Sequence, residues 1–94
     1  MFAWDPRKAE ANAAKHGVTF DDAVTVFLDP DGFDGPDLQH SAAESRFRRL
    51  GRSADGRVLI VAYTLRRSGN AETIRIISAR QASRRERAAY AAQN

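Results

Sequence analysis

Residues 46–80 read RFRRLGRSADGRVLIVAYTLRRSGNAETIRIISAR, and this stretch decides the fold. It contains three runs typical of β-strands, which are Arg46 to Arg52, Arg57 to Arg66 and Glu72 to Arg80. Asp55-Gly56 separates the first two runs, and this dipeptide is a strong signal for a tight hairpin turn. Residues 67–70 separate the last two runs. The stretch therefore predicts an antiparallel meander of three strands.

Two helices are expected before the meander. Asp5 and Pro6 begin the first, because Asp is a good N-cap and Pro fits the first helical position. His16 ends it, and Gly17 supplies the left-handed residue that follows many helices. The second helix starts at Thr19, in a variant of the capping box, and ends before Pro30. Its apolar residues recur at helical spacing and predict one buried face; they are Phe20, Ala23, Val24, Phe27 and Leu28.

The remaining segments complete an α+β pattern. Phe2 to Trp4 is expected to form a short edge strand, and residues 29–45 a loop that could contain a strand near Phe33. Ser83 to Glu86 is a capping box, so a last helix is expected from about Arg84 to Gln93. We therefore predict a single domain, residues 1–94, in which two N-terminal helices and a C-terminal helix pack on an antiparallel β-sheet. One face of the sheet is expected to pack on helices, and the other to be at least partly covered.

The charge is divided unevenly between the two halves of the chain. Residues 1–45 contain three basic and nine acidic residues, a net charge of −6, whereas residues 46–94 contain twelve arginines and three acidic residues, a net charge of +9. A domain with this division has a basic face that suits a polyanion or an acidic protein partner. Thirteen of the fifteen basic residues are Arg, which binds phosphate through two parallel hydrogen bonds.

Alternation along the strands predicts which side chains share a face. In the third strand it places Arg75, Ile77 and Ala79 opposite Ile74, Ile76, Ser78 and Arg80. Arg84 and Arg85 begin the last helix, where the helix dipole disfavours cations. An anion bound at that N-terminus would reverse the penalty. Alternatively, the arginines are solvated and their stems cover apolar surface.

Several functions are not expected. The chain has no cysteine, and His16 and His40 lie 24 positions apart, so neither a disulfide nor a metal site is predicted. No cofactor is expected. No apolar run approaches the roughly 20 residues of a membrane span, and the N-terminus lacks the apolar stretch of a signal peptide. We therefore expect a cytoplasmic protein without membrane contact.

Three segments together resemble the BrnT-type toxins of bacterial type II toxin–antitoxin systems. They are FAWDPRKAEANAAKHGVTFDDAVTVFLDP at 2–30, DLQHSAAESRFRRLGRSADGRVLIVAYTLR at 37–66 and IRIISARQASRRERAAY at 74–90. The resemblance implies a RelE-like ribonuclease fold and an endoribonuclease that cleaves RNA and inhibits translation. It also implies a cognate BrnA-type antitoxin. The toxin would contact DNA only indirectly, through this antitoxin. A longer turn at residues 67–71 departs from the family pattern.

RNA cleavage without a metal needs a base for the 2′-hydroxyl, an acid for the leaving oxygen and cations for the phosphorane. Of the titratable candidates, His40 is the first choice for proton transfer because histidine titrates near neutrality, and Glu44 lies close to it in sequence. Asp37, His16 and Tyr63 are alternatives, although His16 is interpreted first as a cation that favours the end of its helix. Tyr90 is expected either to pack on the sheet or to stack on a base.

The arginines are the expected phosphate ligands. We assign Arg75 and Arg80 to the catalytic group with His40, Glu44 and Tyr90. A second group is expected to bind RNA phosphates, and it consists of Arg46, Arg49, Arg52, Arg84 and Arg85. The alternative function is a non-catalytic module whose basic face binds an acidic protein or nucleic acid. That module would use the same arginines but would show no pH-dependent cleavage of RNA.

Overall fold

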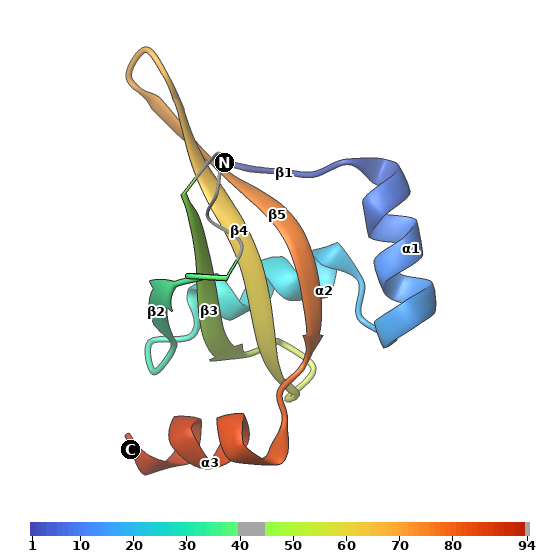
Figure 1. Cartoon of the computed structure of the whole chain (residues 1–94), viewed down its shortest axis with the longest axis vertical. Helices are drawn as coiled ribbons and strands as arrows, with labels where there is room; N and C mark the ends of the chain where they lie inside the picture. Colours follow the sequence, from blue (N-terminus) through green and yellow to red (C-terminus); the bar gives the residue numbers. More distant parts are fainter. Residues whose placement is uncertain (40–44, 94) are drawn as a thin grey trace.

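Five strands form one sheet in the order β1-β5-β4-β3-β2 (Figure 1). A computed structural model describes residues 1–39 and 45–93. The strands are β1 (Phe2–Ala3), β2 (Phe33–Pro36), β3 (Arg46–Arg52), β4 (Val58–Ser68) and β5 (Ala71–Gln81). The helices are α1 (Pro6–His16), α2 (Phe20–Val24), the 3₁₀ helix η1 (Thr25–Leu28) and α3 (Arg84–Ala92). The predicted α+β class is confirmed, as are the edge strand at the N-terminus and the strand near Phe33.

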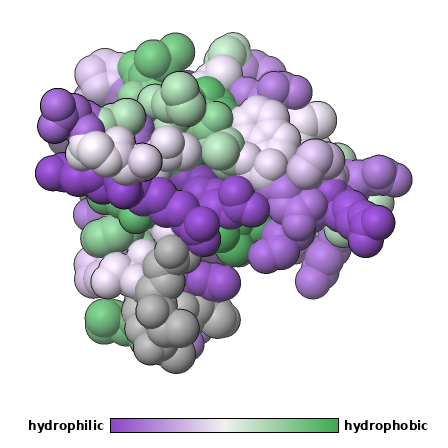
Figure 2. Space-filling view, turned by 90° about the horizontal axis from the view of Figure 1, so that it is seen from above, coloured by the Kyte–Doolittle hydropathy of each residue, from purple (hydrophilic) through white to green (hydrophobic). Residues whose placement is uncertain are grey.

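The meander is antiparallel as predicted, but its second hairpin is longer. β4 and β5 remain paired until Ser68 faces Ala71, so the connection is a two-residue turn in which Gly69 has φ +61°. The expected long turn at residues 67–71 is therefore wrong, because a regular ladder replaces it. The hairpin projects beyond the rest of the sheet (Figure 1). Seen from that end, the surface carries a broad hydrophilic band (Figure 2).

The sheet is mixed, not wholly antiparallel. β1 pairs in parallel with β5, so that Phe2 faces Ile74. The short β1 covers only the first part of the β5 edge. Farther along, the side chain of Asn12 in α1 takes the place of a neighbouring strand. Its Nδ2 donates to Ala79 O at 2.8 Å, and its Oδ1 accepts from Ala79 N at 3.1 Å. Asn12 therefore fixes α1 along the β5 edge.

The helix termini follow the sequence closely, with one difference. Asp5 caps α1, Gly17 follows it at φ +68°, and the Thr19 side chain caps α2. The predicted second helix is α-helical only as far as Val24, and it continues as the 3₁₀ helix η1. This change of winding moves Leu28 away from the core, where it was expected, and leaves it 81% exposed.

Apolar clusters lie on both faces of the sheet. Beneath α1, α2 and η1, the larger cluster includes Phe20, Leu59, Val61 and Ile76. The second cluster lies on the opposite face beside α3, and it consists of Leu50, Val58, Ile60, Ala82 and Tyr90. The expected packing of three helices on the sheet is confirmed, and the second face is partly covered as expected. β4 is apolar on both faces. The N-terminal helices cover the first face, and α3 packs beside the apolar cluster on the second face.

A β-bulge in β5 changes which residues share a face. Ala62 pairs with Ser78 but Tyr63 pairs with Ile76, so Ile77 is the additional residue. Ile76 and Ala79 consequently both face the larger core, with 1% exposure each. The strict alternation expected for this strand is wrong at this point. Arg75 lies on the same face as Arg80, since a bulge places two residues opposite one.

Candidate active site

Four arginines lie on the face of the sheet opposite α1 and α2. Paired residues of neighbouring strands present their side chains on the same face, so the register identifies this group. Arg46 pairs with Thr64, which pairs with Arg75; Leu50 pairs with Ile60, which pairs with Arg80. Arg48 lies between these two rows. We call Arg46, Arg48, Arg75 and Arg80 the arginine face.

A pocket of 440 Å³ opens on the arginine face, and we call it the arginine pocket. Ile60 and Ala62 of β4 form its apolar floor. Arg46 and Arg48 contribute from β3, and Ser78 and Arg80 from β5. Other elements contribute His16, at the end of α1, and Asp37 and Gln39, after β2. Cationic, hydroxyl, carboxyl and imidazole groups thus surround one cavity large enough for part of a nucleotide.

Arg80 is held by an acidic residue at the N-terminus of α3. Its Nη1 and Nη2 donate to the two carboxylate oxygens of Glu86 at 2.7 and 3.0 Å. The same carboxylate accepts from Ser83 N at 2.7 Å and from Arg48 Nη2 at 3.3 Å. The hydrogen bonds from Arg80, followed by the one from Ser83 N, lower the pKa of Glu86 to about 2 against the opposing effect of burial. The anion expected at this helix N-terminus is therefore supplied by the chain itself.

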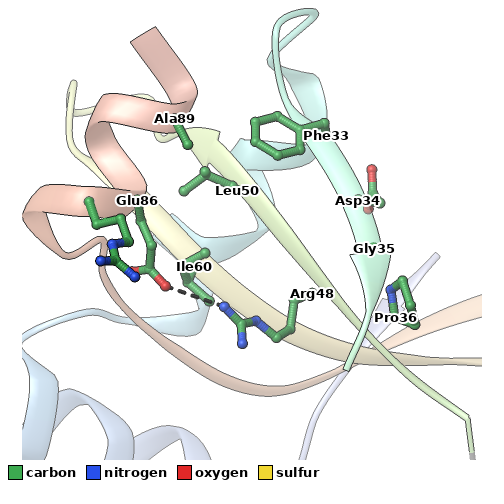
Figure 3. A pocket seen from close by; sticks show the side chains of 10 residues that line it. Phe33, Asp34, Gly35, Pro36, Arg48, Leu50, Ile60, Glu86 and Ala89 are labelled. Atoms are coloured by element: carbon green, nitrogen blue, oxygen red, sulfur yellow. Dashed lines mark hydrogen bonds and ion pairs between the residues drawn. The ribbon is translucent and has the colours of Figure 1, made fainter. Parts of the chain in front are cut away.

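A second pocket, of 410 Å³, lies between β2, β3 and α3. Leu50 and Ile60 form its base, with Phe33 on one side and Ala89 on the other (Figure 3). Figure 3 shows Glu86 reaching from α3 toward Arg48, which lines both pockets. The Arg48–Glu86 pair therefore stands between an apolar cavity and a cationic one.

Arg84 and Arg85 take different positions from Arg80. Both are exposed at the first turn of α3, and Arg85 also lines the second pocket. Glu86, two residues after Arg84, supplies a negative charge in the same turn. This carboxylate offsets the unfavourable interaction of the two arginines with the helix dipole.

Arg49 faces the opposite side of the sheet and supports the fold. Its guanidinium donates to Val26 O and Asp29 O, each at 2.8 Å, and to the Asp34 carboxylate at 2.5 Å. It also lies over the Phe27 ring, with only 13% of its side chain exposed. The expectation that Arg49 binds phosphate is therefore corrected, because its donors hold η1 and β2 against β3.

Arg52 and Tyr90 form a separate contact at the end of the sheet. Tyr90 is 4% exposed, and its hydroxyl donates to Asp29 at 2.5 Å. The Arg52 guanidinium lies over the Tyr90 ring and donates to Gly56 O at 2.8 Å. Of the two roles expected for Tyr90, the structure shows packing on the sheet instead of a ring open to a base. Its assignment to the catalytic group stays a prediction.

Tyr63, another titratable candidate, faces the larger core. Its hydroxyl donates to Asp34 at 2.5 Å. Burial, followed by the negative Asp34, raises the pKa of Tyr63 well above its ordinary range. This phenol therefore remains protonated in neutral solution and anchors β2.

The two groups first chosen for proton transfer, His40 and Glu44, lie outside the described residues. In the described part of the chain, the titratable residues at the arginine pocket are His16 and Asp37. The sequence suggested both, but the Lys15-His16-Gly17 pattern favoured a helix-terminal role for His16. Nothing in local sequence indicates that α1 lies along the β5 edge, and this placement depends on the long-range hydrogen bonds of Asn12.

The described structure contains neither a metal site nor a membrane-spanning helix. Among residues 1–39 and 45–93, no group of three or more His, Cys, Asp and Glu side chains could hold a metal ion. No helix within the same ranges is long and apolar enough to cross a membrane.

A family comparison agrees with the fold. Residues 4–86 match the model of a family described as the ribonuclease toxin, BrnT, of type II toxin–antitoxin systems. The chain therefore belongs to the BrnT family. It is a ribonuclease toxin, and an antitoxin is its partner in such a system.

A solved structure supports this assignment. The chain is similar to the crystal structure of the Brucella abortus ribonuclease toxin BrnT, with a TM-score of 0.64 and 25% sequence identity. The alignment covers 89% of this chain and 99% of that one. Among curated proteins, no sequence matches the chain significantly.

Proposed function

We propose that RNA is cleaved at the arginine pocket, by attack of a ribose 2′-hydroxyl on the adjacent phosphate. The observation that supports this position is the convergence of Arg46, Arg48 and Arg80 on one cavity, with Arg75 on the same face. Guanidinium groups fixed before the reaction stabilise the negative charge that develops on the phosphorane. The ribonuclease assignment of the family requires a site that binds phosphate.

In this proposal the arginines have distinct tasks. Arg80 and Arg48 bind the scissile phosphate, because Glu86 fixes the orientation of both guanidinium groups. Arg46 and Arg75 bind neighbouring phosphates, and the exposed Arg84 and Arg85 add long-range attraction for the strand. His40 and Glu44 remain predictions from sequence for a part in proton transfer.

We propose that the reaction is independent of metal ions and cofactors. Three of the side chains that line the arginine pocket are arginines, and cations repel a divalent ion while taking over its role of neutralising phosphate charge. EDTA should therefore leave cleavage of an RNA transcript unchanged. Loss of cleavage in EDTA that Mg²⁺ or Mn²⁺ restores would contradict this proposal.

The proposed partner is a BrnA-type antitoxin that covers part of the arginine face in the cytoplasm. Neutralisation is then a competition between the antitoxin and RNA for the same guanidinium groups. The complex would contact DNA only through the antitoxin. RNA should therefore not bind the toxin–antitoxin complex at this face, because the arginine face accommodates one of them at a time.

Induced expression in bacteria tests the proposed site. Wild-type protein should arrest growth, and co-expression of the neighbouring antitoxin gene should restore it. Arg46→Ala should weaken the arrest, whereas Arg67→Ala, an exposed change in the β4–β5 hairpin, serves as the matched control. Equal arrest by both variants would place the chemistry elsewhere.

Salt dependence distinguishes the alternative function. RNA affinity should fall steeply between low and moderate salt, because phosphate neutralisation releases counterions. A basic module without catalysis would show the same salt dependence but no cleavage products. Salt-dependent binding with intact RNA at every pH would therefore favour the non-catalytic alternative.

A further inference from the structure

We propose that His16 is a catalytic residue that accepts the proton of the attacking 2′-hydroxyl. This inference rests on the proposed cleavage at the arginine pocket, which His16 lines from the last turn of α1. Its position depends on two features of the fold, the attachment of α1 to the β5 edge and the bulge at Ile77.

The first feature fixes where the last turn of α1 lies. Asn12 is buried, and its amide binds both backbone groups of Ala79 as well as Val18 O, at 2.8 to 3.1 Å. His16 follows Asn12 by four residues, so the two side chains lie on the same side of the helix. Arg57 Nη1 donates to Gly17 O at 3.0 Å and holds the end of the helix as well. The imidazole therefore has a rigid support at the β5 edge.

The second feature, the bulge at Ile77, brings polar side chains of β5 to the same cavity. The bulge at Ile77 places Ser78 and Arg80 on the open face while Ala79 remains in the core. Ile77, Ser78, Ala79 and Arg80 all line the pocket that His16 lines. The side chain at the end of α1 and the phosphate-binding arginine of β5 thus approach one cavity from neighbouring elements.

The other charged groups around the pocket are poor bases. Arg46 and Arg48 from β3 and Arg80 from β5 do not release a proton at ordinary pH. Asp37, after β2, is only 6% exposed and makes interactions of its own. Lys15, the neighbouring charge on α1, is exposed. Among the described residues that line the pocket, His16 alone carries an imidazole, the side chain that most often transfers protons in catalysis.

The proposed step balances without a further reactant. The neutral imidazole accepts the 2′-hydroxyl proton as the 2′-oxygen forms a bond to phosphorus. The bond from phosphorus to the 5′-oxygen breaks, and that oxygen takes a proton from solvent. The products are a 2′,3′-cyclic phosphate and a 5′-hydroxyl end, and no electron transfer occurs.

The test compares His16→Gln with Lys15→Gln, a change of the adjacent exposed residue. Cleavage of a free single-stranded RNA transcript is followed under single-turnover conditions from pH 5 to 9. A general base contributes typically about 10²- to 10⁴-fold, so His16→Gln should slow cleavage by about that factor and lose the rise of rate with pH through the neutral range. Lys15→Gln should keep both the rate and the pH profile.

Two further measurements separate catalysis from folding. His16→Gln should bind the all-deoxy counterpart of the transcript within about twofold of wild type, since imidazole is proposed to act in the reaction only. Its melting temperature should match that of Lys15→Gln. His16→Asn serves as a second variant, and it should reproduce the lost pH dependence with a native melting curve.

Specific results would overturn the inference. An unchanged pH profile in either folded His16 variant would exclude imidazole as the base, as would an equal loss of rate in Lys15→Gln. Different results would contradict the proposed function itself. If wild-type protein leaves the transcript intact, or Arg80→Ala cleaves it at the wild-type rate, the arginine pocket itself is not the site.

Discussion

Arg48 and Arg49 are neighbours in β3, yet they lie on opposite faces of the sheet and belong to different environments. Arg49 is enclosed by η1 and β2, and main-chain oxygens accept most of its hydrogen bonds. Arg48 is paired with the Glu86 carboxylate beside two open cavities, and 40% of its side chain is exposed. Identical side chains are thus a structural anchor on one face and a candidate substrate ligand on the other. The face, and not the residue type, determines the role.

The largest effect on stability is expected for Arg49→Ala. It removes three hydrogen bonds and leaves the partly buried Val26 O and Asp29 O without this donor. Each oxygen keeps a second donor, Asp29 N or Gly32 N, so the cost is that of three lost hydrogen bonds. At about 1 kcal/mol each, the unfolding free energy should fall by about 3 kcal/mol. Arg48→Ala should change it by less than about 1 kcal/mol. Urea denaturation measures both, and equal losses would remove the distinction between the faces.

The next largest effect is expected for Arg80→Ala, and it concerns activity more than stability, although the ion pair with Glu86 is lost as well. Loss of a charge-assisted phosphate contact costs about 1.5–3 kcal/mol, which is about 10- to 100-fold in cleavage rate. Arg80→Lys should recover only part of it, because lysine lacks the two-point geometry. Growth arrest and thermal melting should be measured together. Full toxicity in Arg80→Ala, or a melting temperature that falls enough to explain the loss, would assign Arg80 to the fold.

Glu86→Gln tests how far the arginine face depends on its own carboxylate. The pKa of Glu86 is lowered to about 2, so its contribution to stability is present at neutral pH and is lost as pH falls from about 5 toward 2. At pH 7 the variant should be less stable by about 1–2 kcal/mol, since the ion pair is partly solvated. The difference from wild type should narrow in acid. A constant difference across that range would show that the carboxylate charge is not responsible.

The smallest effect is expected for Arg67→Ala in the projecting hairpin. The Arg67–Glu72 pair measures 3.4 Å, and both side chains are at least half exposed. Exposed pairs of this kind contribute about 0–1 kcal/mol, and this one is screened by solvent on all sides. Melting temperature and growth arrest should both remain close to wild type. A large loss of toxicity would extend the functional surface from the arginine face to the hairpin.

Local sequence patterns predicted the elements that depend on neighbouring residues. The caps at Asp5, Gly17, Thr19 and Ser83 act within one helical turn, and each lies where it was expected. The meander followed from the Asp55-Gly56 turn and the apolar runs that flank it. The α+β class could be predicted because these local signals agree with one another.

Long-range relations could not be predicted in the same way. Alternation in β5 gives no sign of the extra residue at Ile77, since Ile is equally suited to either face. The functions of Arg49 and Tyr90 depend on Asp29 and Asp34, which are distant in sequence. The location of His16 depends on a 67-residue separation between Asn12 and Ala79. The kinds of side chain at the candidate site were therefore predictable from the sequence, but which individual residues line it was not.

The bulge at Ile77 divides β5 into two parts whose residues alternate in opposite order. Odd-numbered residues before the bulge and even-numbered residues after it lie on the open face, so Arg75 and Arg80 share that face although their numbers differ by five. A regular ladder that kept every residue would turn one of the two arginines toward the core and bury its charge. Deletion of Ile77 would instead remove the bulge and leave both arginines on the open face. The positions of these two charges therefore depend on the register of the strand and not on its exact length.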